Sequence, residues 1–475
     1  MLQKYLKFLT TPTSGKSARE TRAVQLPSRA ELAAANAVDS RLCSDSASGD
    51  SPEAEAGSDG NEAHAMQTLQ RFLGRQPLLD SAYRIVGYEL KLRHTGAASP
   101  WSNPEAVQQM QDEMLLIGVI DLDFQRALGD KKVFISLCEA TFDNPLIEQL
   151  PTQKIVVGLT LGPGANEHLL ERCKRLKELG IPLALEDFEY RPEWEPFLKI
   201  CRYVRMDTSR YDALALGDRV KEILSKASPQ LIAKNVDTDD AFQAYRRLSF
   251  DFFEGYHFAE MQPGTPHRLD SSRARVMELL NLAMNHAELS AIEETVKLDP
   301  ALSFKLLSYI NSPVNGFQQK IRSIGHVLVL LGYDQLYRWL TLLLFTSGKP
   351  DARASALLKN ALVRGRFTET LGKSSLPPSE HGSLFIVGIF SLLDALLNIP
   401  MEQAVARLNL PEAVVDALIR REGIYGPYLK LAIACEDFDQ DRIAKYAADC
   451  GMTADEVNIA HVNALIWGEE VDAAG

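Results

Sequence analysis

The chain has 475 residues, of which 46% are hydrophobic and 24% are charged, so we expect two or three domains with sizeable cores. The net charge of −12 argues against a broad basic surface, and we therefore expect no nucleic-acid partner. The six cysteines form no Cys-x-x-Cys pair. They predict neither a zinc site nor a disulfide framework, and indicate a reducing, cytoplasmic setting.

The first 66 residues predict a disordered leader, because Ser, Ala, Glu, Gly and Asp dominate them without a periodic apolar pattern. Their opening stretch, MLQKYLKFL, is short and interrupted by lysines, so it is not a convincing signal peptide, although it could form an amphipathic turn. Further on, the apolar stretch 336–345 is too short to span a bilayer, and Asp394 interrupts the stretch 383–400. Both predict buried core helices, and we expect no transmembrane segment.

Residues 67–265 alternate between short apolar strands and helical stretches such as 103–128 and 164–180. This alternation predicts a parallel sheet with crossover helices, and the number of repeats predicts closure into a (β/α) barrel of the TIM type. The strand candidates are 84–93, 132–138, 154–161, 182–188, 203–207, 230–236 and 252–258.

From residue 270 to the end, strand signals nearly vanish and helix-start signals recur. Ser290 with Glu293, and Thr453 with Glu456, have the spacing of a capping box. Pro300 stands where a helix tolerates proline, in the first turn. Residues 270–475 therefore predict an all-helical domain.

Polar side chains recur at the ends of the predicted strands. In VGYELKLR, alternate residues share a face, so Glu89 and Arg93 would point into the mouth of the barrel. Any one of these residues could instead face solvent at the rim. As a set they predict a ring of ionisable groups, whose other members are Ser136, Glu186, Asp187, Arg205, Asp207, Lys234, Asp237 and Glu254.

Several of these segments, in this order, resemble EAL domains, which are cyclic di-GMP phosphodiesterases. The segments are YELKLR, ALEDFEYRPEW, VRMD, AKNVDT and FFEGYHF, and they span residues 75–262. The resemblance implies a modified TIM barrel. It also implies, for active members, two divalent cations held by carboxylates and one Asn amide, hard oxygen ligands that suit Mg²⁺ or Mn²⁺.

Downstream, the stretch 306–345 resembles the HDOD domain, a helical relative of HD-type phosphohydrolases. An EAL domain followed by an HDOD domain is a known bacterial signalling architecture. The resemblance implies a cytoplasmic regulatory protein with protein partners on the HDOD domain, and a homodimer is possible.

The candidate metal site departs from the EAL pattern at most positions, although Glu89 is retained. Ligand atoms are lost at Ser136 and Gly158, and Lys234 brings a cation that repels a dication by several kcal/mol at ~5 Å. We therefore expect a vestigial site with no metal, no cofactor and no catalytic residue. The other departures are Glu186 with Asp187 for an Asp pair, Arg205 for Lys, Asp237 for Glu and Glu254 for Gln.

In place of metal ions, we expect internal ion pairs. Arg205 and Lys234 would neutralise Glu89, Glu186 and Asp187. The helical domain lacks the paired ligands of its active relatives as well, because the expected His-Asp pair reads Ser391 and Leu392, with one carboxylate, Asp394, nearby. None of His286, His326, His381 and His461 is followed by Asp.

The residues thus favour a non-catalytic regulator that acts by protein–protein contacts in a cyclic di-GMP pathway. One alternative is an active or residual cyclic di-GMP phosphodiesterase, which would need Mg²⁺ or Mn²⁺. A second is a cyclic di-GMP receptor without turnover, with Glu89, Arg93 and Asp207 as ligand-binding residues. A third is metal-dependent hydrolysis in the helical domain.

Overall fold

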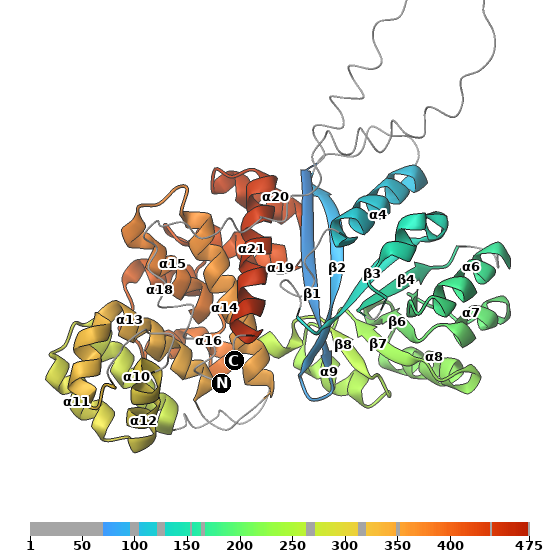
Figure 1. The fold of residues 1–475 in the computed structure, drawn as a ribbon. Helices are drawn as coiled ribbons and strands as arrows, with labels where there is room; N and C mark the ends of the chain where they lie inside the picture. The colour runs from blue at the N-terminus through green and yellow to red at the C-terminus, as the bar shows by residue number, and fades with distance from the viewer. Residues whose placement is uncertain are drawn as a thin grey trace, which may run out of the picture.

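The fold is described from a computed structural model (Figure 1) that covers residues 70–95, 104–120, 129–152, 154–162, 167–262, 271–311, 320–347, 352–437 and 439–473. The predicted leader and the end of the predicted helix 103–128 lie outside these residues. The described part contains a strand-rich barrel followed by a helical domain.

Eight strands form a closed barrel in chain order. From β2 to β8 each strand runs parallel to the next, as the alternation of strands and helices predicts. Bounds are β1 Gln70–Asp80, β2 Ile85–Thr95, β3 Lys132–Cys138, β4 Ile155–Thr160, β5 Leu183–Glu186, β6 Tyr203–Asp207, β7 Gln230–Lys234 and β8 Phe252–Glu254.

The first strand corrects the prediction of an all-parallel sheet. β1 lies between β2 and β8 and is antiparallel to both. It joins β2 by a tight turn in which Tyr83 has a positive φ, so no crossover helix separates the two strands. Because a tight hairpin can join only antiparallel strands, β1 must run against the direction of β2.

Helices pack on the outside of the parallel strands (Figure 1). They are α4 Pro104–Ile120, α6 Glu167–Glu178, α7 Glu195–Ile200, α8 Ala213–Lys226 and α9 Asp239–Arg246, with short 3₁₀ helices η1 Glu139–Asp143, η2 Pro145–Gln149, η3 Pro192–Trp194, η4 Thr208–Arg210 and η5 His257–Ala259. This outer layer buries the apolar residues that face away from the barrel axis, such as Ile135, Val157 and Val204.

The rest of the described chain is helical, with one large apolar core. The helices are α10 Ser271–Met284, α11 Leu289–Lys297, α12 Pro300–Ile310, α13 Ile324–Thr346, α14 Ala352–Gly372, α15 Pro378–Phe390, α16 Leu393–Leu397, α17 Met401–Val405, α18 Glu412–Ile419, α19 Gly426–Asp437, α20 Gln440–Asp449 and α21 Ala454–Ala473.

Helix α13 is the one helix in the described ranges that is long and apolar enough to cross a membrane by length and composition. Two observations make it a core helix of this domain. Gly332 interrupts it with non-helical φ/ψ angles of 66° and 176°, and Leu340, Leu342 and Leu344 are fully buried in the protein core.

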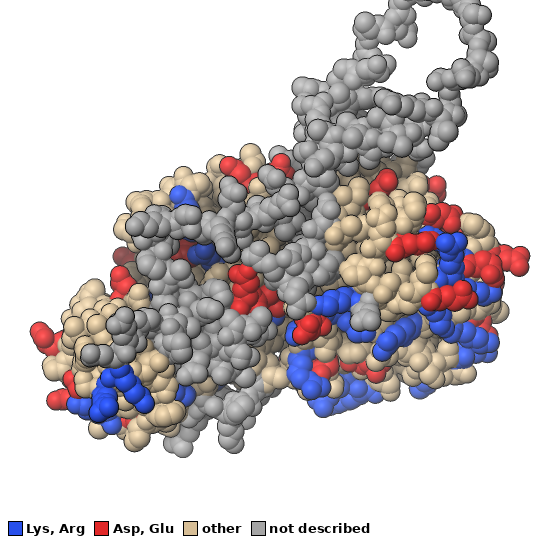
Figure 2. All heavy atoms as spheres, viewed as in Figure 1, with Lys and Arg blue, Asp and Glu red and all other residues tan. Residues whose placement is uncertain are grey.

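The helical domain covers the outer face of the β1–β2 hairpin. Figure 1 shows α19, α20 and α21 beside these two strands, and α21 packs against β1 while α20 packs against β2. On the face drawn in Figure 2, acidic and basic side chains are interspersed over the barrel.

Candidate functional site

The barrel interior has two layers that follow from the two-residue period of its strands. The lower layer is an apolar cluster that contains Phe134, Val156, Ala184, Tyr203 and Ile232. Two residues further along each strand, the next inward side chain lies nearer the C-terminal end. These next inward positions form the polar layer, which contains Ser136, Gly158, Glu186, Arg205 and Lys234, with Glu89 from β2 and Glu254 from β8.

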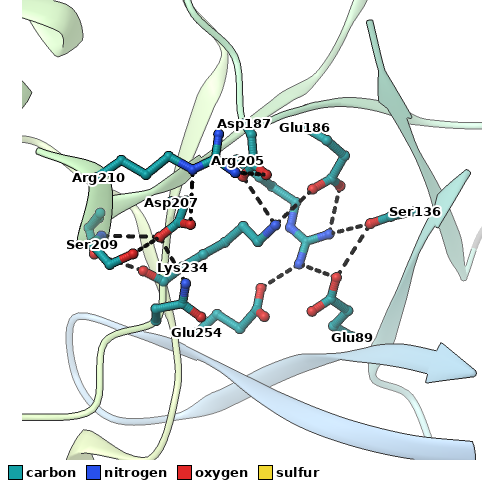
Figure 3. Close-up of polar contacts among 12 residues, drawn as sticks. Glu89, Ser136, Glu186, Asp187, Arg205, Asp207, Ser209, Arg210, Lys234 and Glu254 are labelled. Carbon is teal, nitrogen blue, oxygen red and sulfur yellow. Dashed lines mark hydrogen bonds and ion pairs between the residues drawn. The ribbon is translucent and has the colours of Figure 1, made fainter. Parts of the chain in front are cut away.

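Arg205 lies at the centre of this layer (Figure 3), with 1% of its surface exposed. Its guanidinium is 2.7 Å from Glu89 Oε1 and 2.6 Å from Glu186 Oε1, and it also pairs with Glu254. It donates a further hydrogen bond of 3.0 Å to Ser136 Oγ. One planar cation therefore holds three carboxylates from three strands, as its fork of N–H donors allows.

Two lysines extend the network on either side of Arg205. Lys91 Nζ lies 2.5 Å from Glu89 Oε2 and 3.5 Å from Glu254 Oε1. Lys234 Nζ lies 3.4 Å from Glu186 Oε2 and 3.2 Å from Asp187 Oδ1 (Figure 3). The ion pairs that the sequence predicts for Arg205 and Lys234 are therefore present.

The charges of this network nearly cancel. Burial alone would raise the pKa of the Glu89 carboxyl, but Arg205 and Lys91 hold that pKa well below its usual range. Burial and the adjacent Glu89 charge raise the pKa of Glu254 to about 7, against the effect of Arg205. With Glu254 ionised, the network holds four carboxylates, those of Glu89, Glu186, Asp187 and Glu254, against three cations, and a proton on Glu254 brings the charges into balance.

Gly158 is matched to this arrangement. A Cβ built on Gly158 would clash with the Glu186 side chain, and its nearest atom would be Glu186 Oε1. The longer carboxylate at 186 therefore occupies the space that a side chain at 158 would need, and from there it reaches Arg205. The departures from the EAL pattern at 158, 186 and 205 form one mutually compatible set.

A second polar group lies at the rim. Asp207 accepts hydrogen bonds from Ser209 and from Asn235 Nδ2 at 2.8 Å, and it pairs with Arg210 at 3.2 Å. Burial alone would raise the pKa of Asp207, but these hydrogen bonds and Arg210 lower it. Arg210 also reaches Asp187 at 3.5 Å, so the rim connects to the central network.

Two predicted site residues are not part of the network. Asp237 is exposed, and its carboxylate accepts a 3.4 Å hydrogen bond from the Tyr256 backbone instead of pointing to Arg205. The Arg93 side chain lies outside the described part, so its predicted role in ligand binding stays a prediction.

The residues present do not fit two divalent cations. Glu89, Glu186 and Glu254 are engaged by Arg205, whose positive charge lies among the oxygens that cations would need. A unit charge ~4 Å from a dication repels it by several kcal/mol at an effective dielectric of 20. Among the described residues, no group of three or more His, Cys, Asp and Glu side chains could hold a metal ion.

The helical domain has a similar cluster where its active relatives have the His-Asp pair. Arg364 of α14 donates a 2.6 Å hydrogen bond to Ser391 Oγ. It also forms a bidentate salt bridge with the carboxylate of Glu436 of α19, with N–O distances of 2.8 and 2.6 Å. Asp394 lies outside this contact, and burial raises the pKa of its carboxyl. An arginine therefore lies beside the vestigial position in this domain as well.

Sequence reasoning missed some members of these clusters. Lys91 is two residues from Glu89 and shares its face, so the period of the strand predicts that Lys91 also points into the mouth of the barrel. Gln76, which accepts a hydrogen bond from Lys91 at 3.2 Å, was missed because β1 was missed. Arg364 and Glu436 lie on different helices, 72 residues apart, and no local motif connects them.

Residues 269–397 match the profile of the HDOD domain family. The cyclic di-GMP phosphodiesterase CdgJ of Vibrio cholerae serotype O1 is 27% identical over 406 residues, which cover 84% of this chain and 93% of that protein. The Bacillus subtilis protein YuxH is 26% identical over 408 residues, which cover 84% of this chain and 98% of that protein.

Among solved structures, an EAL domain protein from Listeria monocytogenes aligns with 43% of this chain and 94% of its own, with a TM-score of 0.34 and 16% identity. A standalone EAL protein from Vibrio cholerae O395 aligns with 40% of this chain and 92% of its own, with a TM-score of 0.34 and 17% identity. The closed barrel carries its EAL-type segments on successive strands, and the HDOD match follows it. The chain thus has the EAL–HDOD domain architecture.

Proposed function

We propose that this chain is a non-catalytic regulator in cyclic di-GMP signalling. The observation that carries the proposal is the Arg205 guanidinium, which is buried among the three carboxylates of Glu89, Glu186 and Glu254. Hydrolysis of the active EAL type needs those oxygens for metal ions that activate a water molecule. A fixed cation cannot replace that chemistry, because arginine neither gives up a proton nor binds water as a metal does.

The link to cyclic di-GMP is supported by similarity to CdgJ, which is named a cyclic di-GMP phosphodiesterase, along 84% of this chain. Regulation by protein contacts is supported by the HDOD domain, in which large apolar side chains are exposed. Phe304 of α12 is 72% exposed, Leu298 at the end of α11 is 69% exposed and Val329 of α13 is 66% exposed. The three helices that carry these side chains pack against one another, and exposed apolar side chains are suited to contact with a protein partner.

A residual phosphodiesterase is the main rival. It is favoured by the name of CdgJ and by the acidic residues that remain, which are Glu89, Glu186, Asp187 and Asp237. The charge pattern opposes it, because Lys234 and Arg205 lie among the first three of these residues.

A hydrolysis assay separates the two. Full-length protein is incubated with cyclic di-GMP and Mn²⁺, and the linear dinucleotide is quantified against Glu89→Ala as the matched control. We expect equal, background-level product in both samples. Product that forms in the wild type and is lost in Glu89→Ala would establish the phosphodiesterase and refute the regulator.

A further inference from the structure

Three neighbouring strands of the barrel, β8, β1 and β2, have two different environments on their two faces. The inward residues Gln76, Glu89 and Glu254 belong to the charge network around Arg205 and Lys91. The outward side of β1 packs against α19 and α21 of the helical domain, and β2 packs against α20 as well as against α4 of the barrel (Figure 1). Along these strands, side chains therefore point alternately into the barrel mouth and toward the domain interface.

Glu469 of α21 is the centre of that interface. Its Oε1 lies 2.8 Å from Arg75 Nη1 of β1 and accepts a 2.9 Å hydrogen bond from the Tyr88 hydroxyl of β2. Its Oε2 lies 2.7 Å from Lys359 Nζ of α14. Arg75, Lys359 and Glu469 are all at least nine-tenths buried. Breaking such a buried pair is costly, since one charge would stay buried without its partner.

The third strand, β8, reaches the interface through a closely packed glycine. Glu254 of β8 is followed by Gly255, where φ is 143° and a Cβ would clash with the Val236 carbonyl. The next residue, Tyr256, lines a cavity of about 30 Å³ between the domains, together with Arg75, Tyr88, Lys359, Asn360, Glu436 and His461. A cavity of this volume with polar side chains in its lining has room for a water molecule at the interface.

We propose that β8, β1 and β2 couple the two domains, so that a change in the network residues carried by these three strands alters how tightly α21 docks on the barrel. This rests on the proposed function, in which the network has a structural task and the HDOD domain binds partners. The pairs Arg75–Gln76 and Tyr88–Glu89 each place an interface residue and a network residue on one stretch of backbone. A strand that shifts to relieve unpaired charge in the mouth therefore displaces the partners of Glu469.

Hydrogen–deuterium exchange of the full chain tests this coupling, with peptides from α21 as the readout. Glu89→Gln and Lys234→Gln each remove one charge from the network. Glu89 lies on β2, which contacts the helical domain, whereas Lys234 lies on β7, away from Glu469. We expect at least about fivefold faster exchange of α21 in Glu89→Gln and no change in Lys234→Gln, because coupling requires a shared two-state element.

The coupling is also reciprocal, so Glu469→Gln should accelerate exchange in β2. If Glu89→Gln does not fold, Lys91→Gln replaces it, since Lys91 also lies on β2 and pairs with Glu89. Unchanged exchange of α21 in the β2 variant, or equal acceleration in Lys234→Gln, would overturn the proposal. The hydrolysis assay is scored separately, so active wild-type protein would refute the proposed function without deciding whether the domains are coupled.

Discussion

At the scale of single residues, the structure explains why the departures from the EAL pattern occur together. Arg205 needs carboxylates within reach, Glu186 supplies one of them, and Gly158 leaves the space that Glu186 fills. Removing one partner from a buried ion pair generally costs about 3–5 kcal/mol. Reverting a single position toward the EAL pattern should therefore harm the barrel rather than restore a metal site.

Gly158→Ala tests this dependence. The added Cβ would clash with the Glu186 side chain, so we expect the free energy of unfolding to fall by about 1–3 kcal/mol, as overpacking does. Chemical denaturation measures the change. Gly217→Ala in α8 is the control, because its Cβ meets only Leu248 at an ordinary 3.4 Å. Adding Glu186→Asp should recover part of the loss, and a neutral Gly158→Ala would show that Glu186 does not need this space.

Part of the site could be predicted from single positions. The two-residue period of the strands placed Glu89, Glu186, Arg205, Lys234 and Glu254 in one layer, because inward residues near the C-terminal ends of parallel strands converge. Asp237 follows β7 in a loop, where the period of the strand no longer fixes the direction of its side chain. It therefore lies apart from the residues that the strands direct inward.

At the scale of elements, β1 and the helix N-termini show where sequence patterns fail to predict a strand or the start of a helix. The sequence of β1, QRFLGRQPLLD, contains Gly and Pro and does not alternate, and partners far along the chain fix its pairing. The capping box of Thr453 and Glu456 is confirmed by reciprocal hydrogen bonds. The one at Ser290 is wrong, because α11 already begins at Leu289.

At Gly332, the backbone conformation that glycine allows explains the break in helix α13. Its φ of 66° and ψ of 176° divide α13 into two helical segments. Essentially only glycine adopts this conformation, at a cost of about 1–3 kcal/mol for other residues.

Gly332→Ala should therefore lower the free energy of unfolding by about 1–3 kcal/mol through backbone strain alone, because no atom lies within 4 Å of the added Cβ. Thermal and chemical denaturation measure the change. Gly382→Ala, inside the regular helix α15 with its nearest atom 3.9 Å away, should instead be neutral or stabilising by up to about 1 kcal/mol. Equal effects of the two substitutions would contradict a glycine-specific break in α13.

At the scale of the whole molecule, the helical domain covers a face of the barrel that the barrel's own helices leave uncovered. The β1–β2 hairpin has no crossover helix, and α20 and α21 cover it. Arg75 and Glu469, which join the two domains, are 394 residues apart. No sequence period relates positions so distant, so the interface could not be predicted even though both domains were.

The central claim is that Arg205 takes the place of metal ions in the mouth of the barrel. Titration of the full chain with Mn²⁺, followed by electron paramagnetic resonance, tests it most directly. Glu89→Gln serves as the control, because acidic residues elsewhere could bind Mn²⁺ in both proteins. The account predicts identical binding curves for the two proteins. Two ions that bind the wild type and are lost in Glu89→Gln would contradict it.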